Sequence, residues 1–387
     1  MAKKMRVSDY VVNFLYDNGV HDVFHVSGGG IMYLGDSLGR SKLRYICNHH
    51  EQASAMAMEG YARIKGFGAA IVTTGPAVTN TLTGVAGAYV DSTPCMVISG
   101  QTNEMIGNSG LRQLGLQELD TMSIVKPLTK YAVTVMNPKD IRYHLEKARY
   151  ISINGKPGPV WIDIPLGVQG AEIDGNNLAP FDNEIENIGK KRNADLESLV
   201  SLSIEKLLSA QRPIIYAGRG VDVSNARKDF NEFIERVGAP VVVSWNGADL
   251  IYEDHPLYVG RPGIFGQRAA NFAVQNSDVL LNIGSRLSIG QLGYNFNSFA
   301  RSAYKIIVDV DKAELDKKTI KPDLKIESDA KLFLEEMNRQ LGGRKGTYGE
   351  WMEICNKWKA DYPVINPENF KGTYINSYAL VDRLSTH

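Results

Sequence analysis

Residues 66–103 read GFGAAIVTTGPAVTNTLTGVAGAYVDSTPCMVISGQTN, and Asp91 is the only charged side chain among them. Two short apolar runs, at 69–74 and 95–100, flank a segment with a helical pattern. Central strands of a parallel sheet are covered on both faces and therefore consist almost entirely of apolar residues. The stretch predicts the buried centre of a large α/β domain.

The segments on either side continue the alternation of strand and helix. VFHV (23–26) precedes a run of three glycines, HHEQASAMAMEGYARIKG (49–66) predicts a helix that begins near Glu51, and VWIDIP (160–165) closes this half. Strand, helix and strand at this spacing are typical of βαβ units and a parallel sheet. We expect a first domain over residues 1–172.

A second α/β series follows a change in composition. Residues 173–195 include part of the charged run KKRNADLE (190–197) and predict a solvated linker. Apolar runs at 213–220, 278–286 and 305–311 then predict a smaller Rossmann-like domain over residues 196–341. Residues 342–387 predict a linker and the start of a further domain, because they end in an amphipathic helical pattern without a cap. The predicted fold class is α/β, with two doubly wound parallel-sheet domains.

Composition excludes several classes of function. Lys plus Arg and Asp plus Glu both total 43, and this zero net charge argues against a dedicated nucleic-acid binder. No apolar run approaches the roughly 18 residues of a membrane span. The widely spaced Cys47, Cys95 and Cys355 predict reduced thiols and a cytoplasmic protein. The histidines lack metal-ligand spacing and no Cys-x-x-Cys occurs, so we expect no metal ligands in this chain.

Glu51 is the first candidate for chemistry. The next charge on its predicted helix is Glu59, so we expect a helix that is buried on most faces. A carboxyl group entering such a region loses hydration, which favours the protonated acid and prepares a proton donor. The alternative is a solvated helix cap. Gly75 and Pro76 form a turn after the strand at 69–74, where ligands of open α/β sheets bind, unless it is a plain βα turn.

Four motifs together resemble those of a known family. HEQASAMAMEGYARIKG (50–66), TTGPAVTN (73–80), KPGPVWIDIP (156–165) and IVDVDKAEL (307–315) are similar, in this order, to the thiamine-diphosphate enzymes of the acetohydroxyacid (acetolactate) synthase type. The resemblance implies a pyrimidine-binding first domain and a Rossmann-like central domain. It also implies a third domain, whose Gly-Asp-Gly motif holds Mg²⁺ and the diphosphate. No Gly-Asp-Gly occurs here, so we expect that domain to be missing and the chain alone to be inactive.

The resemblance assigns roles residue by residue. Glu51 matches the glutamate that donates a proton to N1′ of the aminopyrimidine, and the cofactor then serves as electron sink for a 2-keto acid. Gln117 matches the Gln of a Phe-Gln-Glu segment near the reaction centre. Positions that match the cofactor pocket are Gly28, Gly29, Thr73, Pro76 and Asn80.

The sequence also departs from the family's pattern. Val26-Ser27 stands where Tyr-Pro is usual, Leu116 replaces a Phe, and Ala77 replaces a Gly. These changes leave the cofactor step intact but alter the substrate wall, so the substrates stay open. His25 and His49 are candidate pocket residues, although a lone histidine is more often structural.

The second domain resembles the one that binds FAD in acetohydroxyacid synthases. Matching positions are Gly218, Arg219, Gly220 and Arg286, together with the loop GRPGIFG (260–266). Val223 stands where the third glycine of a GxGxxG belongs, and Phe265 replaces a usual His. Related enzymes keep this domain with ADP or with nothing, so FAD is one of three alternatives.

The hypothesis with most support is a thiamine-diphosphate-dependent transferase or lyase that decarboxylates a pyruvate-type 2-keto acid and joins two carbon units. The resemblance implies a homodimer or homotetramer with active sites between subunits. The charge balance and the lack of a long apolar run predict partners that include neither nucleic acid nor membrane. One alternative is a simple 2-keto acid decarboxylase or another thiamine-diphosphate lyase or hydrolase. Another is a non-catalytic or split-enzyme subunit. A nicotinamide dehydrogenase is excluded by the incomplete dinucleotide fingerprint.

Overall fold

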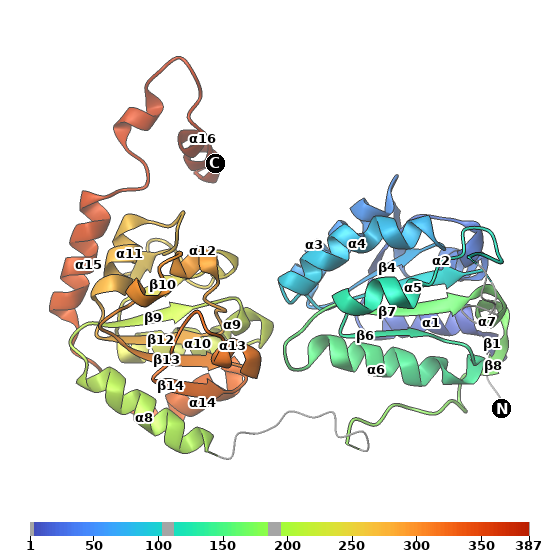
Figure 1. Ribbon diagram of the computed structural model, residues 1–387, viewed down its shortest axis with the longest axis horizontal. Helices are drawn as coiled ribbons and strands as arrows, with labels where there is room; N and C mark the ends of the chain where they lie inside the picture. The colour runs from blue at the N-terminus through green and yellow to red at the C-terminus, as the bar shows by residue number, and fades with distance from the viewer. Residues whose placement is uncertain (1–3, 103–111, 185–194, 387) are drawn as a thin grey trace. The chain divides into compact units, whose positions relative to one another are not determined.

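The chain divides into two compact units, Met1–Lys190 and Lys191–His387. The computed structural model describes residues 4–102, 112–184 and 195–386 (Figure 1). Residues 185–194 of the predicted linker lie outside the described residues. No helix within the described ranges has the length and apolar character that crossing a membrane requires.

The first unit is built on a parallel sheet of order β3-β2-β4-β5-β7-β6. Its strands are β2 (Asp22–His25), β3 (Arg44–Cys47), β4 (Gly68–Val72), β5 (Cys95–Gln101), β6 (Tyr131–Thr134) and β7 (Val160–Pro165). Its helices are α1 (Val7–Asp17), α2 (Met32–Arg40), α3 (Glu51–Lys65), α4 (Pro76–Val90), α5 (Thr121–Val125), α6 (Ile141–Ile153) and α7 (Leu166–Gly170). A short antiparallel pair joins β1 (Lys4–Arg6) to β8 (Glu172–Asp174), so part of the predicted linker belongs to this unit.

The charge-free stretch forms the centre of this sheet, as predicted. Every residue of β4 and β5 is buried. Successive side chains point to opposite faces, so Ile71 enters the cluster that includes α1, α2 and α6, while Ala70 and Val72 enter the cluster that includes α3 and α4. Two covered faces explain why these strands carry no charge.

Helix α3 is less enclosed than its composition predicts. Its N-cap, His50, accepts a hydrogen bond from the Gln52 backbone N–H, and its C-cap is Gly66. One side packs on α4 and the sheet, but Met56 is 47% exposed and Ile64 is 82% exposed. The expectation of a helix buried on most faces is therefore wrong, because its neighbours in this chain cover only one face.

The second unit contains a parallel sheet of order β11-β10-β9-β12-β13-β14. Its strands are β9 (Pro213–Ala217), β10 (Val241–Val243), β11 (Tyr258–Gly260), β12 (Val279–Ile283), β13 (Tyr304–Asp309) and β14 (Leu324–Glu327). Its helices are α8 (Leu196–Ser209), α9 (Gly220–Val223), α10 (Arg227–Val237), α11 (Arg268–Asn276), α12 (Ile289–Leu292), α13 (Lys312–Asp316), α14 (Ala330–Leu341), α15 (Gly349–Asp361) and α16 (Ser377–Ser385).

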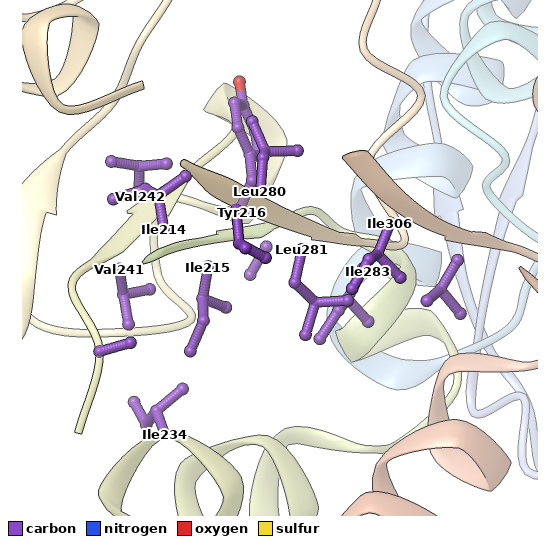
Figure 2. Packing of buried hydrophobic residues seen from close by; sticks show 14 of the residues in the cluster. Ile214, Ile215, Tyr216, Ile234, Val241, Val242, Leu280, Leu281, Ile283 and Ile306 are labelled. Carbon is purple, nitrogen blue, oxygen red and sulfur yellow. The ribbon is translucent and has the colours of Figure 1, made fainter. Parts of the chain in front are cut away.

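The core of the second unit alternates in the same way. Figure 2 shows Ile215 and Leu281 pointing toward Ile234 of α10, whereas Tyr216 points to the opposite face. All five strand pairings of this sheet are parallel. The predicted fold class, two doubly wound parallel-sheet units, is thus confirmed.

The second unit extends beyond residue 341, where the sequence predicts a linker. Trp351 and Cys355 of α15 are buried in its core, and the indole N–H of Trp351 donates to the Pro213 carbonyl at 3.0 Å. The hydroxyl of Tyr348 donates to the Leu207 carbonyl at 2.6 Å. The stretch 348–361 therefore completes the second unit, because its aromatic side chains fill that core.

Candidate functional site

The predicted residues of the first unit gather at one edge of its sheet. Strands β3, β2, β4 and β5 are neighbours and run parallel, so their carboxyl ends meet. The loops and helix starts that follow these strands carry the seven residues that the resemblance assigns to this unit: Gly28, Gly29, Glu51, Thr73, Pro76, Asn80 and Gln117. Ligands of open α/β sheets bind at such an edge.

The glycine loop after β2 lies directly on Thr73. The backbone N–H of Gly30 donates to Thr73 Oγ1 at 3.1 Å. A Cβ at Gly28 would lie 2.5 Å from Thr73 Cγ2, so only glycine fits there. A Cβ at Gly29 would meet nothing within 4 Å. The loop therefore turns its closed side to β4 and presents the Gly29 backbone to open space.

Two buried side chains that sequence reasoning missed support this edge of the sheet. Gln169 is fully buried and donates to the Gly30 carbonyl at 2.7 Å. Thr74 donates to the Gly100 carbonyl at 3.1 Å, which ties the end of β4 to β5. Both bonds end on backbone carbonyls, so they leave no motif in the sequence.

The Gly75 turn brings Gln117 to the same edge. Gly75 has φ +65° and ψ −110°, and Pro76 begins α4 immediately after it. A Cβ at Gly75 would lie 1.9 Å from the backbone oxygen of Gln117. Gln117 itself has φ +61°, and its neighbour Leu116 is 83% exposed. The two predicted segments, far apart in sequence, are therefore in backbone contact.

Glu51 and Asn80 form the polar pair of the site. The side-chain amide of Asn80 donates to Glu51 Oε2 at 2.9 Å. Within the part of the chain that the structure describes, no group bonds to Oε1. Both side chains are half-buried, so the expected enclosure of Glu51 is incomplete in a single chain, because α3 and α4 cover it from one side. A carboxyl group oriented through one oxygen can exchange a proton through the other.

The two candidate histidines lie in different surroundings. His25 is buried at the end of β2, and its Nδ1–H donates to the Ile71 carbonyl at 3.2 Å. Burial lowers the pKa of His25, which keeps the ring neutral. This hydrogen bond gives His25 a structural role, while His49 is exposed.

A buried carboxyl group lies on β7, beside β5. Asp163 of β7 is 1% exposed and accepts from Ser99 Oγ at 2.5 Å and from Thr134 Oγ1 at 3.3 Å. The indole N–H of Trp161 donates to the same Ser99 at 2.7 Å. Burial raises the pKa of Asp163 to about 7, and hydrogen bonds from Ser99, Thr134 and Gln101 partly offset this. The folded protein therefore favours the protonated acid.

Asp163 makes stability depend on pH. Because its folded pKa lies above the unfolded value, the folded state binds the extra proton, and the free energy of unfolding falls as the pH rises from about 4 to about 7. Asp163→Asn removes this titration and should gain stability relative to the wild type over that window, by as much as about 4 kcal/mol. Urea unfolding of both proteins between pH 4.5 and pH 7.5 measures the difference. Parallel curves would show that Asp163 does not titrate there.

In the second unit, the glycine loops after β9 and β12 contact each other. The Gly218 N–H donates to the Ile283 carbonyl at 2.9 Å, and the Gly220 N–H donates to the Gly284 carbonyl at 3.0 Å. A Cβ at Gly220 would lie 2.7 Å from the Cα of Gly284. This contact accounts for the small residues at these positions. The loops also carry the predicted Arg219 and Arg286, the latter 4.0 Å from Glu314.

Two aromatic side chains follow the neighbouring strands of this sheet. Trp245, after β10, is 57% exposed, and Phe265, after β11, is 79% exposed. Their ring centroids are 6.1 Å apart. Asn271 fixes the loop of Phe265, because its side chain accepts from the Gly263 N–H at 2.9 Å and donates to the Gly263 carbonyl at 3.0 Å. Sequence reasoning missed Trp245. It could have been noticed as a large aromatic residue that closely follows an apolar strand.

Two family models match the chain. Residues 5–124 match the model described as thiamine pyrophosphate enzyme, N-terminal TPP binding domain. Residues 200–337 match the model described as thiamine pyrophosphate enzyme, central domain. The two matches fall one in each compact unit.

Curated relatives are similar over most of the chain. A probable acetolactate synthase large subunit of Methanococcus aeolicus is 34% identical over 376 residues, which cover 94% of this chain and 61% of the relative. Another, of Methanocaldococcus jannaschii, is 36% identical over 86% of this chain and 56% of the relative. The acetolactate synthase isozyme 2 large subunit of Escherichia coli K12 is 32% identical over 93% and 64%. The chain thus spans 56–64% of the length of these relatives.

Proposed function

Because the chain belongs to the thiamine pyrophosphate enzymes, with their N-terminal and central domains, we propose that it is part of an enzyme that decarboxylates a 2-keto acid and forms a carbon–carbon bond, as an acetolactate synthase does. The observation that carries this proposal is the Glu51–Asn80 pair, which lies at the same sheet edge as the Gly28–Gly30 loop and the Gly75 turn. The names of the relatives support the reaction class.

The residues at this edge fit the aminopyrimidine half of thiamine diphosphate. When bound, the cofactor supplies an electron sink for loss of CO₂ from a 2-keto acid. Glu51 would hold a proton at Oε1 for the pyrimidine nitrogen, while Asn80 fixes its other oxygen. A glutamine in place of Glu51 would keep a hydrogen bond but transfer no proton. The open side at Gly29 leaves room for a ring beside the backbone.

The diphosphate and Mg²⁺ are assigned to a further domain, as in the sequence-based hypothesis. Among the described residues, no group of three His, Cys, Asp or Glu side chains could hold a metal ion. Because no Gly-Asp-Gly motif occurs in this sequence, we expect this chain alone to bind thiamine diphosphate weakly and to show no turnover. Isothermal titration calorimetry with and without Mg²⁺ measures this. Micromolar, Mg²⁺-dependent binding by the chain alone would contradict the assignment.

A nucleotide, either FAD or ADP, is proposed for the second unit, and the alternative is that this unit binds neither. Arg219 and Arg286 supply positive charge beside the glycine loops, and Trp245 and Phe265 offer aromatic faces at the same sheet edge. Aromatic rings stack on flat bases, and guanidinium groups bind phosphates. The absorbance spectrum of the purified protein tests whether FAD is bound. If the protein shows no flavin absorbance and also fails to bind ADP, the second unit has a structural role only.

Assembly into a homodimer or homotetramer is also proposed, with active sites between subunits. Exposed apolar side chains on α3 and α4 support it: Met56, Ile64, Tyr89 and Val90. Sedimentation of the complete protein tests this, and a strictly monomeric profile would count against it. A cytoplasmic location remains part of the proposal, supported by three free cysteines.

The reaction is tested with a protein that carries this chain together with the diphosphate-binding domain. Incubation with pyruvate, thiamine diphosphate and Mg²⁺ should yield acetolactate. Acetaldehyde as the product would identify a simple decarboxylase instead. Absence of any product from 2-keto acids would favour a non-catalytic or split-enzyme subunit.

A further inference from the structure

The segment that carries Gln117 is closed by its own Glu118. The carboxylate of Glu118 accepts from the backbone N–H groups of Leu114 at 2.9 Å and Gly115 at 2.6 Å. The Glu118 N–H in turn donates to the Gly115 carbonyl at 3.3 Å. Hydrogen bonds to a charged acceptor are among the stronger ones. Residues 114–118 therefore form a compact loop, and a single hydrogen bond from another part of the chain can fix the position of the whole loop.

Gln101 supplies that tether. It is the last residue of β5 and is fully buried. Its amide nitrogen donates to the Leu119 carbonyl at 3.1 Å and lies 3.4 Å from Thr121 Oγ1. Its amide oxygen accepts from the Thr102 N–H at 3.1 Å. A buried amide is costly unless it is hydrogen-bonded, and here both ends of the group are used.

The tether acts next to the contact between Gln117 and Gly75. Leu119 follows Gln117 by two residues, and the Gln117 carbonyl lies against Gly75. We propose that Gln101 is a positioning residue, which holds Gln117 at the Gly75 turn through the Leu119 carbonyl. Its effect on catalysis rests on the proposed function, whereas its effect on the position of the loop does not.

The structural part is tested on this chain by hydrogen–deuterium exchange. Gln101→Met keeps the length of the side chain and removes the amide, so the Glu118 and Thr121 amides should exchange about tenfold faster. Gln113→Met is the matched control, because Gln113 is exposed and donates to Gly115 within the loop at 2.8 Å. The control should change exchange by less than twofold. Equal exchange in the two variants would overturn the proposal.

Gln101→Asn is the second variant, in case Gln101→Met fails to fold. It keeps an amide that is too short to reach Leu119, so the same acceleration is expected. Unchanged exchange in this variant, with wild-type thermal stability, would overturn the proposal as well.

The catalytic part is tested in the enzyme completed by the diphosphate-binding domain. Gln101→Met should lower kcat about tenfold, with KM for pyruvate changed less, and this loss should disappear in a Gln117→Ala background. Independent losses in the double variant would show that Gln101 does not act through Gln117. If the wild type converts no 2-keto acid, the proposed function fails, and the exchange experiment alone decides whether Gln101 positions the loop.

Discussion

Glu51→Gln should lower kcat at least about 10²- to 10⁴-fold in an enzyme that carries this chain together with the diphosphate-binding domain. The glutamine preserves the size of the side chain and a hydrogen bond to Asn80, but it has no proton to exchange at Oε1. Steady-state rates with pyruvate measure the loss, and deuterium exchange at C2 of the cofactor measures the proton step itself. Both should fall together.

Glu59→Gln is the control for this prediction. Glu59 lies on the same helix and pairs with Arg63 at 2.6 Å, at a distance of eight residues from Glu51 along the chain. The same chemical change there should leave exchange at C2 within twofold of the wild type. Wild-type exchange in the Glu51→Gln protein would refute the role of Glu51.

Gly75→Ala should disrupt the candidate site and lower the stability of the fold. The backbone at φ +65° and ψ −110° is a conformation that L-residues rarely adopt, which costs about 1–3 kcal/mol. The new Cβ would also lie 1.9 Å from the Gln117 oxygen, so one of the two segments must move. We expect thermal unfolding to occur roughly 6–12 °C lower. We also expect binding of thiamine diphosphate by the complete enzyme to be lost.

Gly66→Ala is the control that separates the cost of the backbone conformation from the cost of the contact with Gln117. Gly66 also has a positive φ, +85°, but a Cβ there would meet nothing within 4 Å. It should therefore lose only the backbone contribution, about 1–2 kcal/mol, and keep cofactor binding. A Gly75→Ala protein no less stable than Gly66→Ala, with cofactor still bound, would show that the contact with Gln117 is not needed.

The layout of both sheets could be predicted from the sequence, because strands that are buried on two faces consist almost entirely of uncharged, mostly apolar residues. The uncharged sequence of β4 and β5 is an example. The exposure of α3 could not be predicted, because the apolar composition of a helix does not show whether this chain or another surface covers it. The place of α15 was missed because the segment is rich in charged residues, whereas the few side chains that enter the core of the second unit, among them Trp351 and Cys355, carry no periodic signal.

The grouping of the candidate site residues at one edge could be predicted from the sequence. Parallel strands bring their following loops to one edge, so residues named by resemblance in four separate segments had to lie together. The side chains that support them, Gln101 and Gln169, were missed. Each bonds to a backbone carbonyl, of Leu119 and Gly30, and every residue carries such a group. Only the folded backbone distinguishes these two glutamines from the others.

The glycine loop after β2 sets limits for protein engineering. A side chain at Gly28 would overlap Thr73, and one at Gly30 would overlap Thr74, so randomised libraries at these two positions would yield mostly misfolded clones. Leu116 is 83% exposed, so position 116 tolerates other side chains. The open space beside Gly29 is the proposed place of the cofactor ring, so a side chain there would compete with the cofactor. Directed evolution toward new substrates should therefore diversify position 116 and keep positions 28, 29 and 30 constant.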